Sequence, residues 1–321
     1  MKTGNKWRRI TKWTAFPALL LLLVSLVINS FVTNNAWSPL ILSSFLNTNT
    51  MIICICIGSS AVIISGGIDI SLGSLVSMCN VLLVSLMMHG MPGYMAVLIM
   101  LAVSAAAGAV NGILIAFLKV TPLLTTFAMS TVFAGVALII MNSPGGSIAE
   151  ELTDLYYSTL AGIPMTAFII LILFAIWKIF KNTPAGIQLY AMGENENKSY
   201  LSGVNTKALQ VFVYSFAGLC AGFGALAVTC MIGAGDPLVG STAGMTAISA
   251  AVIGGVSLAG GRGDITGGIF ASLFLGFLTN LIVALRFDAY SQQMLKAVIL
   301  LAGVVLAVLV GRENMKKKGG K

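Results

Sequence analysis

Residues 94–118 read YMAVLIMLAVSAAAGAVNGILIAFL and contain no charged side chain. A bilayer core about 30 Å thick is crossed by about 20 apolar residues of α-helix, at a rise of about 1.5 Å per residue. This stretch therefore predicts a transmembrane helix. Across the chain 58% of residues are hydrophobic and only 9% are charged, against about one quarter charged in soluble domains. A soluble globular protein is excluded.

About ten apolar segments follow from the same length rule, interrupted by polar or Gly/Pro residues. The fold class is therefore all-α, a polytopic membrane protein with some helices broken or re-entrant. Residues 49–88 form either two spans or a broken re-entrant pair, because only residues 66–71 (GGIDIS) separate their apolar parts. The approximate limits are 15–32, 49–65, 72–88, 94–118, 123–141, 164–180, 210–232, 244–259, 264–285 and 293–310.

The net charge of +8 is concentrated at the two ends and in one central loop, which favours an orienting role in the membrane over nucleic-acid binding. Residues 1–14 are a basic N-tail, 15–310 the transmembrane domain and 311–321 a basic C-tail. With both tails in the cytoplasm, 16 of the 18 lysines and arginines lie on the cytoplasmic side of the membrane. The two exceptions are Arg286 and Lys296. We therefore expect a multi-pass protein of the bacterial inner membrane, with an uncleaved first helix and both termini inside.

Catalytic and metal-binding patterns are missing from the sequence. There is no G-x-x-x-x-G-K-[ST] loop for nucleotide phosphates and no His/Cys/carboxylate cluster at metal-ligand spacing. We expect a non-catalytic chain that binds no cofactor and no metal. The five cysteines lie inside apolar runs and are expected to be small packing residues. They are Cys54, Cys56, Cys79, Cys220 and Cys230.

Asp69 lies among glycines between two apolar runs, in residues 66–74 (GGIDISLGS). Unwound backbone inside a membrane is tolerated only where protein or a water-filled cavity satisfies it. One interpretation is a pathway or gate element that includes Ser71. The other is that Asp69 only caps the following helix, and the residues alone leave both open. Residues 254–261 resemble this segment, which leaves open whether the chain contains a duplicated half.

Residues 181–209 form the long cytoplasmic loop. Residues 190–207 within it predict a short helix, capped by Asn195 and ended by Gly203, with Tyr200 and Leu201 as an apolar tip. Such a helix suggests a docking element for a cytoplasmic partner, although a solvated connector fits the same residues.

Several motifs in a fixed order then resemble one known family, the ribose-type permeases of ABC importers. They are residues 64–74 (ISGGIDISLGS), residues 108–112 (GAVNG), Thr121 with Pro122, Gly193 with Asn195, residues 201–204 (LSGV) and residues 252–263 (VIGGVSLAGGRG). The similarity runs from about residue 50 to 310. It implies a permease that pairs with a second copy or a sister permease in the lipid membrane. It also implies an extracytoplasmic solute-binding protein and a two-cassette ATPase that carries the ATP and Mg.

The resemblance also implies roles for individual positions. A pathway or gate would involve Gly66, Gly67, Asp69, Ser71, Asn111, Thr121 and Pro122. The coupling helix to the ATPase would involve Gly193, Glu194, Asn195, Tyr200, Leu201 and Gly203. A glycine-rich cytoplasmic turn would contain Gly254, Gly255, Gly260, Gly261, Arg262 and Gly263.

Three departures from the family pattern bear on the substrate. They are residues 198–200 (KSY), residues 244–246 (GMT) and Ala134. They put the usual monosaccharide in doubt and are compatible with an asymmetric permease pair. The expected function is import of a monosaccharide or related solute. An ion-coupled secondary transporter is the alternative and a channel or scaffold is third. A secondary transporter usually carries several intramembrane ionisable residues, whereas this chain has few.

Overall fold

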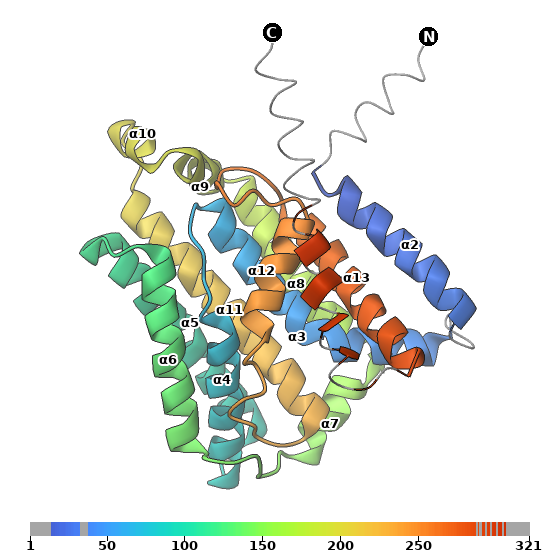
Figure 1. Cartoon of the computed structure of the whole chain (residues 1–321). Coiled ribbons are helices and arrows are strands. Elements are labelled where there is room, and N and C mark those ends of the chain that lie inside the picture. Colours follow the sequence, from blue (N-terminus) through green and yellow to red (C-terminus); the bar gives the residue numbers. More distant parts are fainter. Residues whose placement is uncertain are drawn as a thin grey trace, which may run out of the picture.

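The computed structural model describes residues 14–32 and 38–286, together with 288, 291–292, 294–295, 297–299, 301–303 and 305 (Figure 1). The described chain is mainly helical, with one two-stranded antiparallel hairpin. The helices are α2 (Phe16–Val32), α3 (Pro39–Ile64), α4 (Leu72–Met88), α5 (Gly93–Leu118), α6 (Pro122–Ile140), α7 (Glu150–Tyr157), α8 (Met165–Lys181), α9 (Pro184–Glu194), α10 (Glu196–Leu201), α11 (Thr206–Ile232), α12 (Ala243–Ile253) and α13 (Ile265–Ala284). The strands are β1 (Thr159–Leu160) and β2 (Ile163–Pro164).

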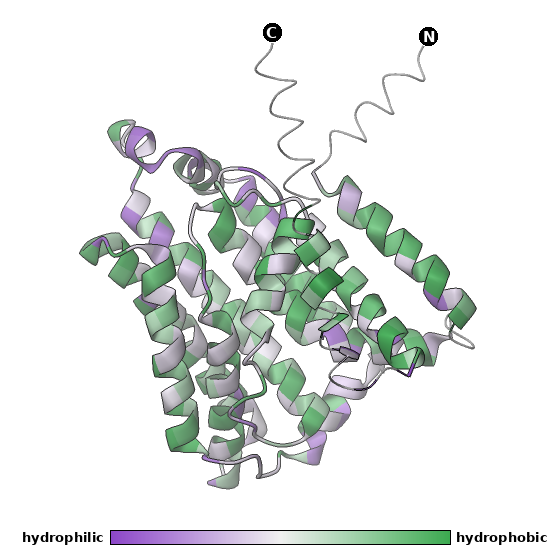
Figure 2. Cartoon of the chain, viewed as in Figure 1, coloured by the Kyte–Doolittle hydropathy of each residue, from purple (hydrophilic) through white to green (hydrophobic). Residues whose placement is uncertain are grey.

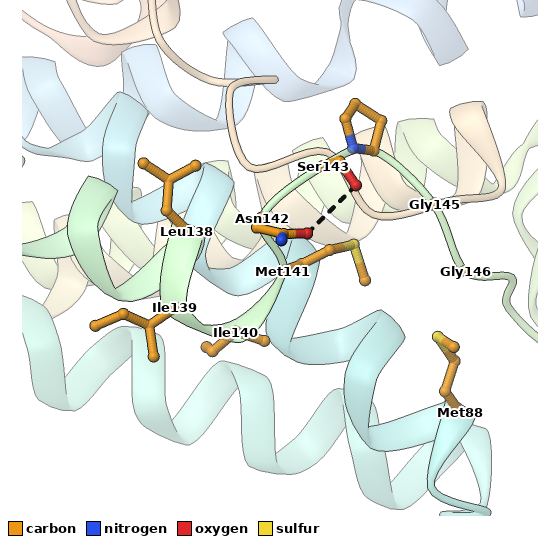
Figure 3. A pocket seen from close by; sticks show the side chains of 10 residues that line it. Met88, Leu138, Ile139, Ile140, Met141, Asn142, Ser143, Gly145 and Gly146 are labelled. Carbon is orange, nitrogen blue, oxygen red and sulfur yellow. Dashed lines mark hydrogen bonds between the residues drawn. The ribbon is translucent and has the colours of Figure 1, made fainter.

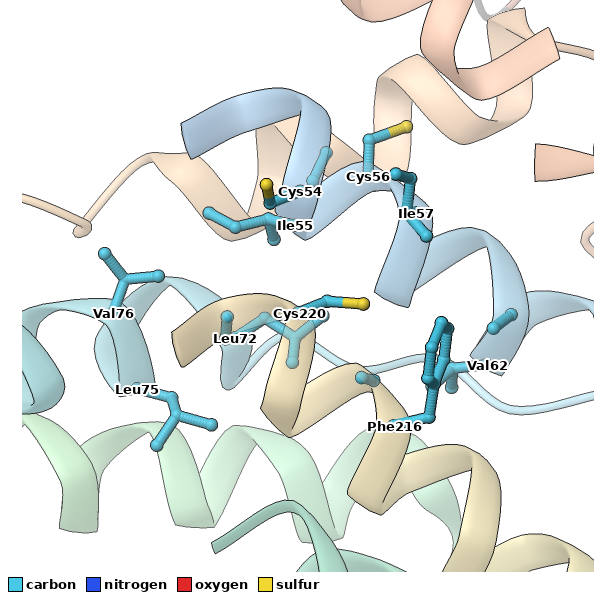
Figure 4. Close-up of a cluster of buried hydrophobic side chains, with 14 of the residues drawn as sticks. Cys54, Ile55, Cys56, Ile57, Val62, Leu72, Leu75, Val76, Phe216 and Cys220 are labelled. Atoms are coloured by element: carbon cyan, nitrogen blue, oxygen red, sulfur yellow. The ribbon is translucent and has the colours of Figure 1, made fainter. Parts of the chain in front are cut away.

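Helix α11 lies at the centre, packed against α5 on one side and α3 on another. Small residues make these contacts possible: a Cβ added at Gly108 or Gly112 would overlap the backbone of α11, and one at Gly58 would lie 2.9 Å from the Cα of Ala217. Close backbone approach of this kind is how membrane helices pack without a strong hydrophobic driving force. Figure 4 shows the apolar side chains around this contact, with Cys54 and Cys220 among them. All five cysteines are free and buried, as expected.

Five described helices are each long and apolar enough to cross a membrane. They are α3, α5, α6, α11 and α13, and the pair α8 and α9, bent by 83°, could make a sixth. Helices α2, α4 and α12 are apolar but shorter. Large hydrophobic side chains are exposed on many of the helices, as a lipid-facing surface requires. Figure 2 shows that hydrophobic residues predominate along the helices. Half of the tenth expected segment, 293–310, lies outside the described residues, as do all of residues 1–13 and 311–321.

Two predicted boundaries were wrong. The second helix begins at Pro39 instead of residue 49, because the polar residues at its start are satisfied within the helix: Thr48, Asn49 and Thr50 bond to carbonyls four residues earlier. The segment 244–259 stops at Ile253, because Gly254 and Gly255 turn the chain, with φ at +85° for Gly255. Helix α3, which contains residues 49–64, is by itself long and apolar enough to cross a membrane without α4.

Two helices begin inside the bundle, after irregular segments. Residues 65–71 precede α4, and residues 233–242 precede α12. Asn80 on α4 fixes the second segment: its Nδ2 donates to Thr229 Oγ1 (2.8 Å) and to the carbonyl of Ala234 (3.1 Å), and its Oδ1 accepts from the amide of Asp236. Helix α4 is about 25 Å long and α12 about 16 Å, at about 1.5 Å per residue. Neither helix is long enough to cross a bilayer unaided by the segment before it.

The bundle has two ends, which we call the α10 end and the α7 end (Figure 1). Helix α11 connects them: it starts beside α10, and near its other end Cys230 packs against Tyr156 of α7. The hydroxyl of Tyr156 donates to the carbonyl of Asn47 at 2.7 Å, and Thr166 on α8 donates to Asn47 Oδ1 at 2.8 Å. Helix α7 and the hairpin are thereby fixed to the membrane helices.

Candidate functional site

Asp69 is fully buried in the segment that precedes α4. Its Oδ1 accepts hydrogen bonds from the backbone amide of Ser71 (2.8 Å) and from the Ser71 hydroxyl (2.6 Å). Asn111 on α5 donates from Nδ2 to the same hydroxyl at 2.8 Å. The structure thus brings together Asp69, Ser71 and Asn111, three of the residues that the sequence assigned to a pathway or gate.

Part of this polar cluster is unsatisfied. Tyr214 of α11 lies beside this segment, because a Cβ added at Gly67 would overlap its hydroxyl. Asp69 Oδ2, Asn111 Oδ1 and the Tyr214 hydroxyl have no hydrogen-bond partner among the described residues, although all three are buried. No described lysine or arginine forms an ion pair with Asp69. Buried polar atoms without partners are costly, at about 1–3 kcal/mol each. A cost of this size inside an apolar core is characteristic of functional positions in membrane proteins.

The N-terminus of α4 compensates the charge of Asp69, because the free amides at a helix start carry a partial positive charge. The N-terminus of α12 faces the same place. A Cβ added at Gly244 would lie 2.8 Å from the carbonyl of Ile70, and one at Gly73 would lie 2.8 Å from the amide of Gly244 and overlap the carbonyl of Gly240. Two helices that start inside the bundle, α4 and α12, therefore meet start to start beside a carboxylate, an arrangement used for solute and ion sites in transporters.

Thr126 of α6 fixes the irregular segment from a third side. Its hydroxyl lies 3.1 Å from the carbonyl of Ile68 and accepts from the amide of Ile70 at 3.3 Å. Thr121 and Pro122, which the family resemblance assigns to the pathway, lie at the start of α6, with Thr121 as its N-cap residue. Sequence reasoning missed Thr126 and Tyr214. A threonine one turn after a helix start and a tyrosine inside an apolar helix carried no distinguishing signal.

At the α10 end, Asn195 caps α10 as expected, with its Oδ1 accepting from the amide of Lys198 at 2.9 Å. Gly203 follows with φ at +85° and ends the turn. Tyr200 and Leu201 are 66% and 84% exposed. The short helix therefore projects from the bundle with an apolar tip that nothing in the described chain covers.

Glycines join the base of this projection to the membrane helices. A Cβ at Gly193 would overlap the carbonyl of Ile64, where α3 ends, and one at Gly260 would overlap the carbonyl of Gly193. The amide of Gly261 donates to Ile64 O at 2.8 Å. The two glycine-rich segments that resemble each other in sequence therefore lie in contact, with Gly193 between them. Residues 254–263 form a turn between α12 and α13, and it contains all six glycine-rich-turn residues.

Charged groups reinforce the same region. Arg262 Nη2 lies 2.9 Å from Glu194 Oε1, and the hydroxyl of Tyr190 donates to the carbonyl of Gly263 at 3.1 Å. Asp264, in the turn just before α13, pairs with Lys178 and Lys181 at the end of α8. Burial opposes ionisation of this carboxyl, but the hydrogen bonds from Lys181 and Lys178 outweigh burial and lower the pKa of Asp264 to about 2. Asp264 therefore holds α8 and α13 together as an anion.

The α7 end carries an open cavity of about 590 Å³ between the end of α6 and the loop that follows it. Figure 3 shows its lining, with Met88 and Met141 on its apolar side and a hydrogen bond of 3.4 Å between Ser143 and Asn142. An isolated bridge between Gly145 and Gly235 ties this loop to the segment before α12. The cavity thus lies at the opposite end of α4 from Asp69, beside the segment that precedes α12.

Comparison with known proteins gives the family. Residues 41–308 match the model described as "Branched-chain amino acid transport system / permease component". The chain belongs to this permease family. The permease is 33% identical over 303 residues to the ribose import permease protein RbsC of Escherichia coli K12, covering 92% of this chain and 93% of that one. It is 29% identical over 314 residues to RbsC of Haemophilus influenzae, with 96% of each chain covered.

The permease is also 31% identical over 294 residues to the autoinducer 2 import system permease protein LsrC of Escherichia coli O157:H7, covering 90% of this chain and 85% of that protein. No solved structure matches the permease. The resemblance to ribose-type permeases of ABC importers is confirmed, and the protein is a transmembrane permease of such an importer. Among the described residues, no group of three or more His, Cys, Asp or Glu side chains could hold a metal.

Proposed function

We propose that this permease forms the translocation pathway for a monosaccharide or a related solute. The names of its relatives, which import ribose, D-allose and autoinducer 2, support this class. In this proposal an extracytoplasmic binding protein delivers the solute, and a second permease copy or a sister permease completes the pathway. A two-cassette ATPase supplies the energy, with ATP and Mg bound on that subunit. The permease itself performs no catalysis.

The observation that carries the proposal is α10, a capped helix with an exposed apolar tip on a base that packs against the end of α3. Exposed Tyr200 and Leu201 fit a groove on a partner, and aromatic anchors of this kind dominate interface energy. The α10 end is cytoplasmic in this proposal, with both termini inside. The charge distribution supports this, because Lys178, Lys181 and Arg262 all lie at that end. Ten crossings are proposed, made by α2, α3, α4, α5, α6, α8, α11, α12, α13 and residues 293–310.

The proposal is tested by purifying the tagged permease from its native membrane and reconstituting it in vesicles with its ATPase and binding protein. Uptake of labelled D-ribose and D-allose is measured with ATP, with ATP plus vanadate, and with a sodium or proton gradient alone. We expect ATP-dependent uptake of at least one sugar that vanadate abolishes. Uptake driven by an ion gradient without ATP would overturn the importer mechanism and favour a secondary transporter. The buried carboxylate of Asp69 is the observation that would then be reinterpreted as an ion-coupling site.

A further inference from the structure

Residues 66–73 connect two places where backbones touch without a side chain between them. At the first, Gly66 lies against Gly260 and Gly193: a Cβ added at Gly260 would lie 2.9 Å from the Cα of Gly66 and overlap the carbonyl of Gly193. We call this contact the outer glycine contact, and it lies directly beside α10. Because nothing compressible separates these backbones, α9 cannot shift without displacing the end of α3.

At the other end of the segment, Gly73 lies against Gly240 and Gly244, where α4 and α12 begin. We call this the inner glycine contact. The amide of Gly240 donates to Ser77 Oγ at 2.9 Å, which adds a direct bond between the two elements. The starts of α4 and α12 are thus fixed relative to residue 73.

The segment between the contacts is held rigidly. Asp69 bonds twice to Ser71, and Thr126 bonds to the backbone at Ile68 and Ile70. Ser71 is bonded in turn to Asn111 on α5. These bonds span most of the segment, so a displacement at Gly66 is carried to Gly73 instead of being absorbed by backbone rotation.

An ion pair and hydrogen bonds also hold the α9 side of the outer glycine contact in place. Glu194, which follows Gly193, pairs with Arg262 at 2.9 Å, and Gly261 bonds to Ile64. Tyr190 bonds to the carbonyl of Gly263. Helix α9, the turn before α13 and the end of α3 therefore form one connected unit beneath α10.

We propose that residues 66–73 are the lever that carries movement of α10 to the facing starts of α4 and α12, through the outer and inner glycine contacts. The inference rests on the proposed role of α10 as the docking helix for the ATPase. Gly193 and Gly73 are positioning residues in this mechanism, since neither touches solute or nucleotide. A rigid connection of this kind passes a domain movement on as a rigid-body shift.

The test follows a spin label on Met245→Cys, at the start of α12, where the native side chain is 60% exposed. The native cysteines are all buried, so we expect the labelling reagent to react at the introduced cysteine. In the reconstituted complex we expect the mobility spectrum of the label to change between the nucleotide-free state and ATP with vanadate. This readout needs no knowledge of the transported solute.

Gly193→Ala should reduce that spectral change at least tenfold, measured in complexes that have retained the ATPase. Gly135→Ala is the matched control, because Gly135 is also helical and a Cβ there meets nothing within 4 Å. A spectral change in Gly193→Ala equal to that of the control overturns the lever. Loss of ATPase association in Gly193→Ala also overturns it, because the outer contact would then merely support the docking helix.

A second pair of variants covers the case in which Gly193→Ala does not fold. Glu194→Arg and Arg262→Glu each reverse one exposed charge, so their effect on folding is small. Each alone should reduce the spectral change at least threefold, and the double reversal should restore it. Single reversals without effect overturn the lever. The proposed function has its own test. It is contradicted if the double variant Tyr200→Ala, Leu201→Ala still associates with the ATPase.

Discussion

Lys178 and Asp264 join the ends of two membrane helices: the Nζ of Lys178 lies 2.9 Å from Oδ2 of Asp264 and 3.0 Å from its Oδ1. Lys181, one turn further along α8, bonds to Oδ2 as well. The same carboxyl accepts from the amide and hydroxyl of Thr266 and so caps α13. The buried carboxylate of Asp264 therefore binds two lysines of α8 and also caps the start of α13.

Asp264→Asn is expected to destabilise the permease by about 1–2 kcal/mol, because charged hydrogen bonds are lost while the half-exposed lysines remain solvated. The folded pKa of about 2 lies below the ordinary value of 3.8. The stabilisation is therefore complete above pH 4 and is lost as pH falls from about 4 toward 2. Thermal unfolding in detergent at several pH values measures this. A wild-type advantage over Asp264→Asn that persists undiminished at pH 2 would contradict the prediction.

Asp69→Asn is expected to lower transport while the protein still inserts. The amide keeps one acceptor for Ser71 but removes the charge that faces the helix starts. Uptake and membrane abundance should be measured together. Asp236→Asn is the matched control, since Asp236 Oδ1 accepts from the amide two residues on, Leu238, at the same 2.8 Å but is not buried. Uptake unchanged by Asp69→Asn would return Asp69 to the role of a replaceable cap.

Tyr200→Ala with Leu201→Ala removes the exposed tip of α10 and should abolish ATPase association and substrate-stimulated hydrolysis. A buried anchor at an interface contributes roughly 1–4 kcal/mol, whereas exposed loop changes elsewhere stay within about 0.5 kcal/mol. Copurification and ATP turnover report the effect. Leu155→Ala with Leu160→Ala is the control, because both leucines are exposed at the α7 end. If the α10 variant keeps ATPase association and substrate-stimulated hydrolysis at the wild-type level, α10 is not the docking helix for the ATPase.

Orientation can be measured with single introduced cysteines, because the native cysteines are buried. Ser202→Cys at the α10 end should react with a membrane-impermeant maleimide only after the cells are opened. Thr159→Cys in the hairpin at the α7 end should react in intact cells, since both positions are exposed in the fold. The opposite pattern would reverse the proposed orientation.

Features that depend on near neighbours in the chain could be predicted from the sequence alone. Length and hydropathy located the helices, because each membrane helix satisfies its own backbone. Asn195 and Gly203 set the limits of α10, because a cap acts within one turn. The family motifs could also be recognised in the sequence, because they are short and occur in a fixed order.

Which of these motifs lie in contact follows from the packing of the helices and could not be predicted from the sequence. Gly66, Gly193 and Gly260 are far apart in the sequence, yet their backbones touch, and Asp69 meets Asn111 through Ser71. The spacing of glycines in the sequence indicates that another backbone approaches closely, but it does not identify that backbone. The polar start of α3 was misread for a related reason: Thr48 and Asn49 count as breaks in an apolar run, whereas the folded helix satisfies them with its own carbonyls. Which residues come into contact depends on how the helices pack around α11. No local pattern in the sequence indicates that packing.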